Sequence, residues 1–285
     1  QYPISLENDI DLSKAYPEWT PIKELKVAIN GKGKLVKGMS ITCPSSDVTN
    51  IGLIGTSYVG AMLLRVEGKI DLRSYSGSSF INVGGIVGYN AKTAATDDTD
   101  EEISQIFTCS FTGNITVPKA ASAVGGVAGT NEGMLWIANY NSKDSSRYTI
   151  YGYGDIGGIA GRNLGKTKNC TAFNANIEHK VNGAERSAGG IVGYCNGGIV
   201  EAGKIVAVTV VSKGSLTSGV RPRMGMAVGH LLNAELPSFS QEGNCSYSCT
   251  ALSASDRVYC FNGTDGYYGL MVNSTIGTTP GQSGP

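Results

Sequence analysis

A short glycine-rich phrase recurs six times along this 285-residue chain and limits the possible folds more than any other feature. The copies are Gly52-Leu-Ile-Gly55, Gly84-Gly-Ile-Val-Gly88, Gly125-Gly-Val-Ala-Gly129, Gly157-Gly-Ile-Ala-Gly161, Gly189-Gly-Ile-Val-Gly193 and Gly225-Met-Ala-Val-Gly229. Their last glycines are 33, 41, 32, 32 and 36 residues apart. A period of this size indicates stacked units, each too small to bury a core alone.

The residue types within each unit favour strands over helices, because β-branched residues alternate with glycines that oppose a helix. We expect three short strands in a unit, for example Gly189–Tyr194, Gly198–Ala202 and Lys204–Val211. Three strands and three turns in 32 residues describe one coil of a parallel β-helix. The glycines are expected at turns of positive φ and at close backbone contacts. A propeller or an antiparallel sandwich is the alternative.

Aligned copies predict which way each position faces. The position two before the last glycine is always apolar and is predicted to point inward: Leu53, Ile86, Val127, Ile159, Ile191 and Ala227. The position just after that glycine varies in size and charge, which predicts an outward-facing column that ends in a surface His230. Asn90, Asn131 and Asn163 fall in one column, where amides of successive coils can hydrogen-bond to one another.

The cysteines divide into two sets. Cys109 and Cys170 are expected in an interior column of small residues that includes Ala138 and Ala202, two coils apart and therefore as free thiols. Cys245, Cys249 and Cys260 cluster where the repeat fades, and the sequence leaves open whether a disulfide forms there.

The repeat also suggests how the chain is organised. Residues 1–40 are expected to form an N-terminal lead-in and cap, residues 41–235 the repeat, and residues 236–285 a C-terminal cap and tail. The 41-residue interval is explained by an acidic loop at 91–102 that protrudes from one coil. Capped ends are expected because an open β-helix otherwise exposes its strand edges.

Composition argues against nucleic-acid binding, and the apolar runs are too short for a membrane span. Charged residues make up only 16% of the chain and the formal net charge is zero, against about 25% charged residues in an ordinary domain. We therefore expect no nucleic-acid binding, which depends on phosphate neutralisation. The longest apolar run, Ile205–Val211, is far shorter than the roughly 20 residues of a membrane span.

The repeats resemble the GLUG motif of bacterial surface proteins, adhesins and the non-catalytic parts of IgA-specific metallopeptidases. The N-terminus resembles the lead-in that precedes such repeats, with Ile10-Asp-Leu-Ser, Trp19-Thr-Pro-Ile22 and Ile29-Asn-Gly-Lys-Gly. The lead-in lacks a Phe-x-Gly, and Met226 stands where a glycine is expected. The resemblance implies an all-β, right-handed parallel β-helix of about six coils, secreted or on the bacterial cell surface, without a catalytic activity. No hydrophobic signal segment is present, so export rests on this resemblance.

Residues that could carry chemistry are sparse. Neither His179 nor His230 belongs to a His-Glu-x-x-His motif, and no phosphate loop opens a helix, so no metal and no cofactor are expected. A glycosidase needs two carboxylates on one face. Asp155 aligns with Ala123 and Ser187, and Glu201 with Ile137 and Asn169, so no carboxylates are stacked.

Binding is therefore the predicted function. The candidate binding residues are Tyr89, Tyr148, Tyr151, Tyr153 and Tyr194, because a tyrosine offers a flat apolar face and a polar tip. We expect an adhesion or ligand-binding module that presents a flat face to a glycan or to a host or matrix protein. A β-helical polysaccharide lyase or glycoside hydrolase is one alternative, and a structural spacer for another domain is the second.

Overall fold

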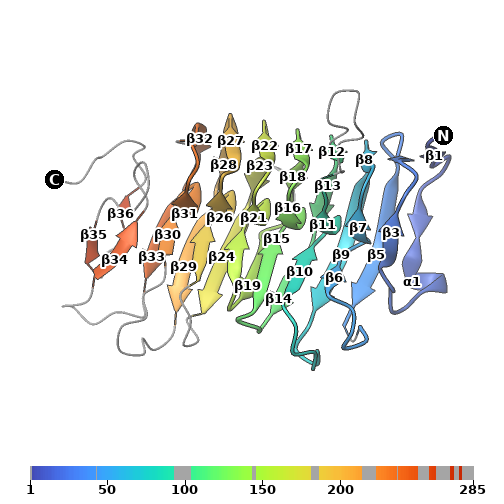
Figure 1. Cartoon of the computed structure of the whole chain (residues 1–285), viewed down its shortest axis with the longest axis horizontal. Helices are drawn as coiled ribbons and strands as arrows, with labels where there is room; N and C mark the ends of the chain where they lie inside the picture. The colour runs from blue at the N-terminus through green and yellow to red at the C-terminus, as the bar shows by residue number, and fades with distance from the viewer. Residues whose placement is uncertain are drawn as a thin grey trace.

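The computed structural model is a parallel β-solenoid whose coils follow one another from the N-terminal to the C-terminal end, which confirms the predicted β-helix (Figure 1). The structure describes residues 2–42, 44–92, 104–142, 146–180, 186–213, 223–235, 237–249, 257–260, 270–272 and 276–277. Side chains are described up to Ser246. The predicted acidic loop at 91–102 lies almost wholly outside these residues.

A complete coil visits four sheets, which we number I to IV in chain order. Sheet I contains β6 (Asn50–Ile51), β10 (Ile81–Gly84), β15 (Ser122–Gly125), β20 (Asp155–Gly157), β25 (Ser187–Gly189), β30 (Arg223–Gly225), β34 (Arg257–Cys260) and β35 (Leu270–Val272). Sheet II contains β3 (Ile22–Leu25), β7 (Ile54–Ser57), β11 (Val87–Asn90), β16 (Ala128–Asn131), β21 (Ala160–Asn163), β26 (Val192–Asn196) and β31 (Val228–Leu232).

Sheets III and IV complete the coil. Sheet III contains β1 (Ile4–Ser5), β4 (Ile29–Asn30), β8 (Gly60–Met62), β12 (Gln105–Phe107), β17 (Met134–Trp136), β22 (Lys166–Lys168) and β27 (Ile199–Glu201). Sheet IV contains β2 (Ile10–Asp11), β5 (Leu35–Ile41), β9 (Arg65–Asp71), β13 (Ser110–Thr112), β14 (Ile115–Val117), β18 (Asn139–Tyr140), β19 (Tyr148–Gly152), β23 (Thr171–Phe173), β24 (Ala175–Lys180), β28 (Gly203–Val206), β29 (Thr209–Lys213), β32 (Phe239–Glu242), β33 (Ser246–Cys249) and β36 (Ile276–Gly277). Helix α1 (Leu12–Ala15) packs on β5.

Neighbouring strands pair in parallel, with one register shift between Val36 and Met39 where β5 pairs with β9. The exceptions are β36 on β33 and β35 on β34, which are antiparallel. Strands β3, β4 and β5 from the predicted lead-in pair directly with β7, β8 and β9 of the repeat. The proposed boundary at residue 40 and the capping role of the two ends stay predictions.

The prediction of three strands in a coil was wrong. The glycine phrase is not one strand: Gly125 ends β15, Gly126 and Val127 turn, and Ala128 begins β16. Sheet IV is also bent, so that two short strands such as β13 and β14 occupy the length of β9. Periodicity could not show these corners, because the chain changes direction with only two residues between strands.

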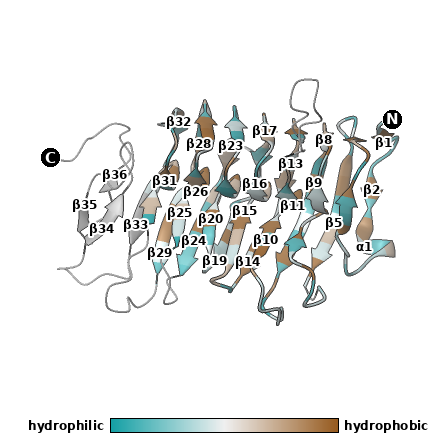
Figure 2. Cartoon of the chain, in the orientation of Figure 1, coloured by the Kyte–Doolittle hydropathy of each residue, from teal (hydrophilic) through white to brown (hydrophobic). Residues whose placement is uncertain are grey.

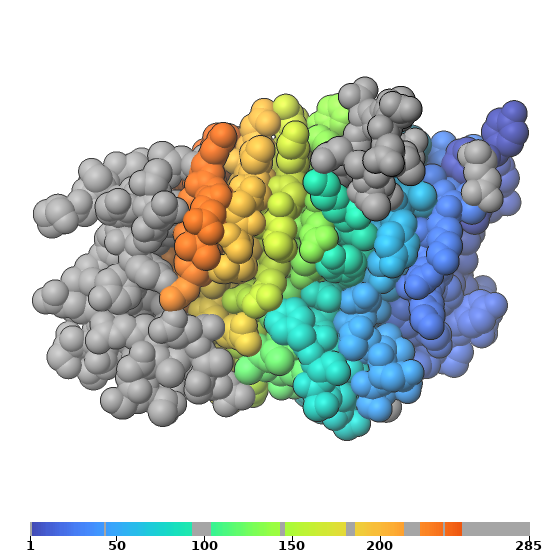
Figure 3. All heavy atoms as spheres, viewed as in Figure 1, coloured from blue at the N-terminus to red at the C-terminus, as the bar shows by residue number. Residues whose placement is uncertain are grey.

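The shared interior follows the predicted apolar column. Leu53, Ile86, Val127, Ile159, Ile191 and Ala227 are all buried, and apolar residues recur at the same level of successive coils (Figure 2). Two large rings of sheet IV, Phe111 and Tyr140, stack inside the solenoid with centroids 6.4 Å apart. Each coil therefore contributes one layer to a continuous core, and the coils form adjacent bands across the visible surface (Figure 3).

The glycine phrase produces a re-entrant corner between sheets I and II. A Cβ on Gly126 would lie 2.4 Å from the Tyr140 ring, so this glycine lets the corner approach sheet IV from inside. A Cβ on Gly129 would lie 2.3 Å from the backbone nitrogen of Val83, so this glycine lets the outer faces of sheets I and II meet. None of the six last glycines has a positive φ, so close approach, and not the predicted turn conformation, explains the motif.

The corner between sheets II and III is held by the predicted amide ladder. Asn90 donates to Asn131 at 2.8 Å and Asn131 donates to Asn163 at 2.7 Å, and all three are fully buried. The hydrogen bonds confirm that these amides pair from coil to coil.

The corner between sheets III and IV uses a left-handed backbone instead of glycine. Leu63, Thr108, Ile137, Asn169 and Ala202 all have φ between 48° and 54°. The next residue in each coil points inward, and it is here that Cys109, Ala138 and Cys170 lie buried; the two cysteines are free thiols as predicted.

Ala202 was wrongly placed in that interior column. Cys170 is instead followed by Gly203, and Ala202 is exposed. The five-residue strand β26 and Gly197 insert one residue before β27, which shifts every later position of that coil. The same shift sets Glu201 beside Lys168, not beside Asn169 as predicted. Among the described thiols, Cys245 is also free and buried, while the side chains of Cys249 and Cys260 lie outside the described ones.

Candidate functional site

The outer face of sheet III carries two aromatic rings that strand pairing brings together. Met62, Phe107, Trp136, Lys168 and Glu201 face outward at one level of β8, β12, β17, β22 and β27. The rings of Phe107 and Trp136 pack with their centroids 4.9 Å apart and an interplanar angle of 49°. We call this column the aromatic face.

A shallow depression lies at the charged end of the aromatic face. It has a volume of about 190 Å³ and is lined by Met134, Lys166, Thr167, Lys168, Ile199 and Glu201. The Lys168 ammonium and the Glu201 carboxylate form an ion pair at 2.8 Å across the two coils. Apolar ring surface and paired polar groups thus stand next to each other on one rigid sheet.

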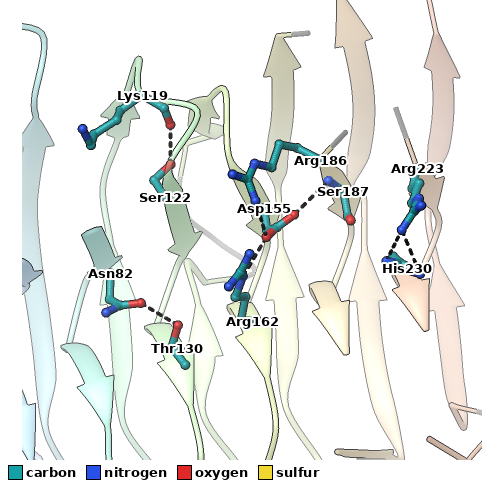
Figure 4. Close-up of polar contacts among 10 residues, drawn as sticks. All are labelled: Asn82, Lys119, Ser122, Thr130, Asp155, Arg162, Arg186, Ser187, Arg223 and His230. Carbon is teal, nitrogen blue, oxygen red and sulfur yellow. Dashed lines mark hydrogen bonds and ion pairs between the residues drawn. The ribbon is translucent and has the colours of Figure 1, made fainter. Parts of the chain in front are cut away.

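The re-entrant corner between sheets I and II forms a second polar surface, drawn in Figure 4. Outward side chains of the two sheets contact each other there, because the corner folds their outer faces together. The Thr130 hydroxyl donates to Asn82 at 2.6 Å, and Arg162 Nε donates to Asp155 at 2.7 Å. The outer surface of the corner is therefore lined by hydrogen-bonded pairs.

Asp155 is the carboxylate at the centre of this corner, with only 4% of its side chain exposed. Its Oδ2 accepts from Arg162, and Arg186 Nη1 lies 3.7 Å from the same oxygen. The backbone nitrogen of Ser187 donates to Oδ1 at 3.1 Å. A buried carboxylate needs this many partners to offset its desolvation.

His230 lies in the same corner and corrects the prediction of a surface histidine. It is only 8% exposed, because the outward face of β31 is turned toward sheet I. Arg223 Nη1 lies 2.8 Å from its Nδ1, and the Tyr194 ring packs on it at a centroid distance of 4.9 Å. Burial, with the Arg223 charge as a second cause, lowers the pKa of His230 to about 4.

The other histidine is a core residue. His179 on β24 is buried with its Nδ1 3.0 Å from the Ser212 hydroxyl, and its Nε2 has no hydrogen-bond partner. Burial lowers its pKa to about 4. Its place inside the solenoid makes it unavailable to an external ligand.

The predicted tyrosines do not form one site. Tyr151 and Tyr153 come together at the end of β19, with ring centroids 5.9 Å apart in an edge-to-face contact. Burial raises the pKa of Tyr151 to about 12, with a hydrogen bond to Tyr153 as the second cause. Tyr148 lies on the opposite face of β19 and packs against the core.

Tyr89 and Tyr194 belong to the outward column of sheet II, three coils apart. Burial, followed by a hydrogen bond to Glu132, raises the pKa of the Tyr89 phenol. Tyr194 instead lies between Arg162, whose guanidinium carbon is 5.4 Å from the ring centroid, and His230.

Sequence reasoning missed the aromatic face and the arginine cluster, which consists of Arg162 and Arg186 around Asp155. Phe107 and Trp136 belong to different coils, and the acidic loop at 91–102 separates Phe107 from the last glycine of its own copy, so that the two rings do not fall in one column of the aligned copies. Arg162 and Asp155 lie seven positions apart in one unit, a spacing that brings residues together only at a re-entrant corner.

Several charged residues on adjacent coils pair with a residue of opposite sign. Besides Lys168 and Glu201, Lys204 pairs with Glu242 at 2.7 Å, and Lys213 with Glu178 at 3.2 Å. Cross-strand pairs of opposite charge favour the observed register. Over the described part of the chain, no group of three or more His, Cys, Asp or Glu side chains could hold a metal ion.

Comparisons with known proteins add little to this geometry. No family model matches the chain, and no curated protein is detectably similar to it in sequence. Among solved structures, the chain is similar to the crystal structure of a "putative immunoglobulin A1 protease" from Bacteroides ovatus, with 19% sequence identity and a TM-score of 0.48. The match covers 92% of this chain and 77% of that one. A likeness at this level carries no information about activity or ligand. In the described residues, no helix is long and apolar enough to cross a membrane.

Proposed function

We propose that this chain is a non-catalytic binding module, extracellular or on a bacterial cell surface, that presents the aromatic face of sheet III to a glycan or to a host or matrix protein. The extracellular setting rests on the resemblance of its repeats to the GLUG motif. The place of binding rests on the Phe107–Trp136 pair.

Exposed apolar groups around this pair support binding. Met62 is 37% exposed, and Leu63 and Ile137 at the adjoining corner are each 38% exposed. Contiguous exposed apolar surface on a soluble protein marks interaction sites. Because the rings stand on paired strands of adjacent coils, their spacing is fixed before a ligand arrives, which reduces the entropy lost on binding.

The neighbouring depression supports a ligand with both apolar and polar faces. A sugar ring stacks its C–H groups on an aromatic ring and presents hydroxyls at its edge, where charged groups such as Lys168 and Glu201 can bond to them. Glu201 is the one carboxylate in the lining of the depression and is bound to Lys168. A glycosidase uses two carboxylates, so this lining favours binding over hydrolysis.

The test is binding of the chain to an array of glycans and extracellular-matrix proteins. We expect hits whose affinity falls about tenfold or more in Trp136→Ala, since aromatic anchors dominate such contacts. The control is the double variant Tyr151→Ala with Tyr153→Ala, which removes two rings from another surface. It is expected to leave those hits unchanged. A blank array, or hits unaffected by Trp136→Ala and Phe107→Ala, would contradict the proposal. Release of soluble product from a polysaccharide panel would contradict its non-catalytic part.

A further inference from the structure

The exposed apolar side chains of the chain are concentrated around one sheet. Beyond the N-terminal segment 2–16, the described side chains include six large apolar residues that are 37% to 40% exposed. All six lie on sheet III or at its two corners: Tyr58, Val59, Met62, Leu63, Ile137 and Leu164. The Phe107–Trp136 pair stands on the same sheet. An apolar patch gathered in this way marks an interaction surface.

The apolar part of this surface offers little to a sugar. The outward positions of β8, β12 and β17 hold Gly60, Gln105 and Met134 in one column, and Met62, Phe107 and Trp136 in the other. Gln105 brings the one side-chain amide of these six positions, and the Trp136 Nε1 is itself buried and cannot reach a ligand. The two rings are inclined at 49° and pack on each other, so they do not form one flat platform. A sugar covered here would leave hydroxyls without partners, which costs free energy, whereas apolar side chains would not.

The size of the surface limits what can cover it. Strands β8 to β27 are separated by four interstrand distances, about 19 Å, and the stretch from Val59 to Leu63 crosses them over about 13 Å. This footprint of about 250 Å² is roughly a third of the 800 Å² that each partner contributes to a standard interface. Two copies of the chain joined through this surface would bury too little for a stable dimer. The surface therefore matches a short segment of a partner, and not a second copy of the chain.

The charged end of the surface indicates the charge of that segment. Lys166 and Lys168 face outward from β22, next to the coil of Trp136, and Lys168 is paired with Glu201. Lys166 is exposed and has no ion-pair partner among the described side chains. All three line the depression, where two lysines and one glutamate give one net positive charge. A carboxylate on the partner complements this charge.

We infer that the partner of the aromatic face is a short segment of another protein, which covers Phe107 and Trp136 with apolar side chains and pairs an acidic side chain with Lys166. The inference rests on the proposed function and narrows it to a protein partner instead of a glycan. An extended segment of about six residues spans the five strands.

Selection from a phage-displayed library of random twelve-residue peptides tests the inference. The library is first depleted on the Trp136→Ala chain and then selected on the wild-type chain. We expect enriched peptides in which aromatic or branched aliphatic residues stand near an Asp or a Glu. Synthetic peptides of these sequences should bind the wild-type chain about tenfold or more tighter than the Trp136→Ala chain in calorimetric titration.

Charge reversal places the acidic residue of the peptide. Lys166→Glu should weaken peptide binding about fivefold, because it replaces an attractive pair by a repulsive one. Exchange of the acidic residue of the peptide for lysine should restore the affinity for the Lys166→Glu chain and weaken that for the wild-type chain. The control Lys69→Glu makes the same change at an exposed lysine of sheet IV and should leave the affinity unchanged. Thermal unfolding of each variant shows that the fold is retained.

Three results would overturn the inference. They are a selection in which no peptide prefers the wild-type chain, enriched peptides without an acidic residue, and peptides that bind the folded Lys166→Glu chain as well as the wild type. If the array gives only glycans whose binding depends on Trp136, the proposed function stands and this inference fails.

Discussion

Two corners of the coil solve the same turning problem in opposite ways. The re-entrant corner between sheets I and II uses glycines at Gly126 and Gly129, because a Cβ there would strike the Tyr140 ring or the Val83 backbone. The corner between sheets III and IV has a left-handed backbone but is occupied by residues as different as Leu63, Ile137 and Asn169. Where an added Cβ would clash with neighbouring atoms, only glycine fits. Where only the backbone angle is demanding, the side chain points outward and its type is free.

The largest expected effect breaks the corner that is limited by space. Gly129→Ala places a methyl group 2.3 Å from the Val83 backbone nitrogen, which cannot move without breaking sheet I. We expect a loss of about 3 kcal/mol in the free energy of unfolding, at the upper end of overpacking effects. Urea denaturation of the two proteins measures it.

The matched control is Gly197→Ala. Gly197 has a φ of 67°, but the nearest atom to an added Cβ is 3.9 Å away. The cost there is only the left-handed conformation, about 1 kcal/mol. Equal losses at Gly129 and Gly197 would show that steric exclusion adds nothing to the cost of a Cβ at the re-entrant corner.

The corner between sheets II and III adds a third solution, based on hydrogen bonds. Asn131→Ala removes the amide between Asn90 and Asn163 and leaves buried polar groups of both without that partner. We expect a loss of about 2 kcal/mol in unfolding free energy, the cost of unsatisfied buried groups. Asn139→Ala on the outer face of β18 is the control and should change it by less than about 0.5 kcal/mol. A loss no greater than that of the control would mean that the ladder does not hold this corner.

Acid should weaken the re-entrant corner. His230 has a pKa of about 4 in the folded chain, against an ordinary value of 6.5, because it is buried near Arg223. As the pH falls below 6.5 the unfolded chain takes up the proton first, so this contribution to stability is complete above pH 6.5 and is lost as the pH falls through 4.

The stability difference between the wild-type chain and His230→Gln isolates this effect. We expect it to shift by about 1 kcal/mol against the wild type between neutral pH and the folded pKa, less than the full shift implies because solvent screens the corner in part. A difference that is constant with pH would contradict the assignment of a neutral, buried His230.

An effect of similar size but opposite sign is expected at the corner between sheets III and IV. Ile137 is β-branched, has a φ of 54° and is 38% exposed, so it bears backbone strain and contributes little to the core. Asn169 occupies the same place one coil later. Ile137→Asn is expected to stabilise the chain by about 1 kcal/mol, seen as a raised unfolding midpoint. A lowered midpoint would show that the Ile137 side chain matters more than its backbone conformation.

The differences between the corners also explain which features could be predicted from the sequence. The repeated glycines and the Asn90–Asn131–Asn163 column were readable because packing or hydrogen bonding fixes the residue type. The sequence did not predict the left-handed corner between sheets III and IV. It also did not predict the extra residue in β26, and the positions expected for Ala202 and Glu201 were therefore wrong. The arginine cluster could not be predicted, because Asp155 and Arg162 contact each other only where the outer faces of sheets I and II meet at a re-entrant corner. The predicted coil of three strands and three turns did not include such a corner. Five tyrosines selected by type alone fell on different faces.

The re-entrant corner itself is tested most directly by joining its two walls. Asn82 on sheet I and Thr130 on sheet II are 48 residues apart, and their side chains hydrogen-bond at 2.6 Å. In the double variant Asn82→Cys with Thr130→Cys, a short thiol-reactive cross-linker followed by peptide mass mapping should join these two positions in most molecules. The control Asn82→Cys with Gln105→Cys places the second thiol on the outer face of sheet III and should give no such link. A failure to link the first pair while each thiol reacts singly would contradict the fold described above.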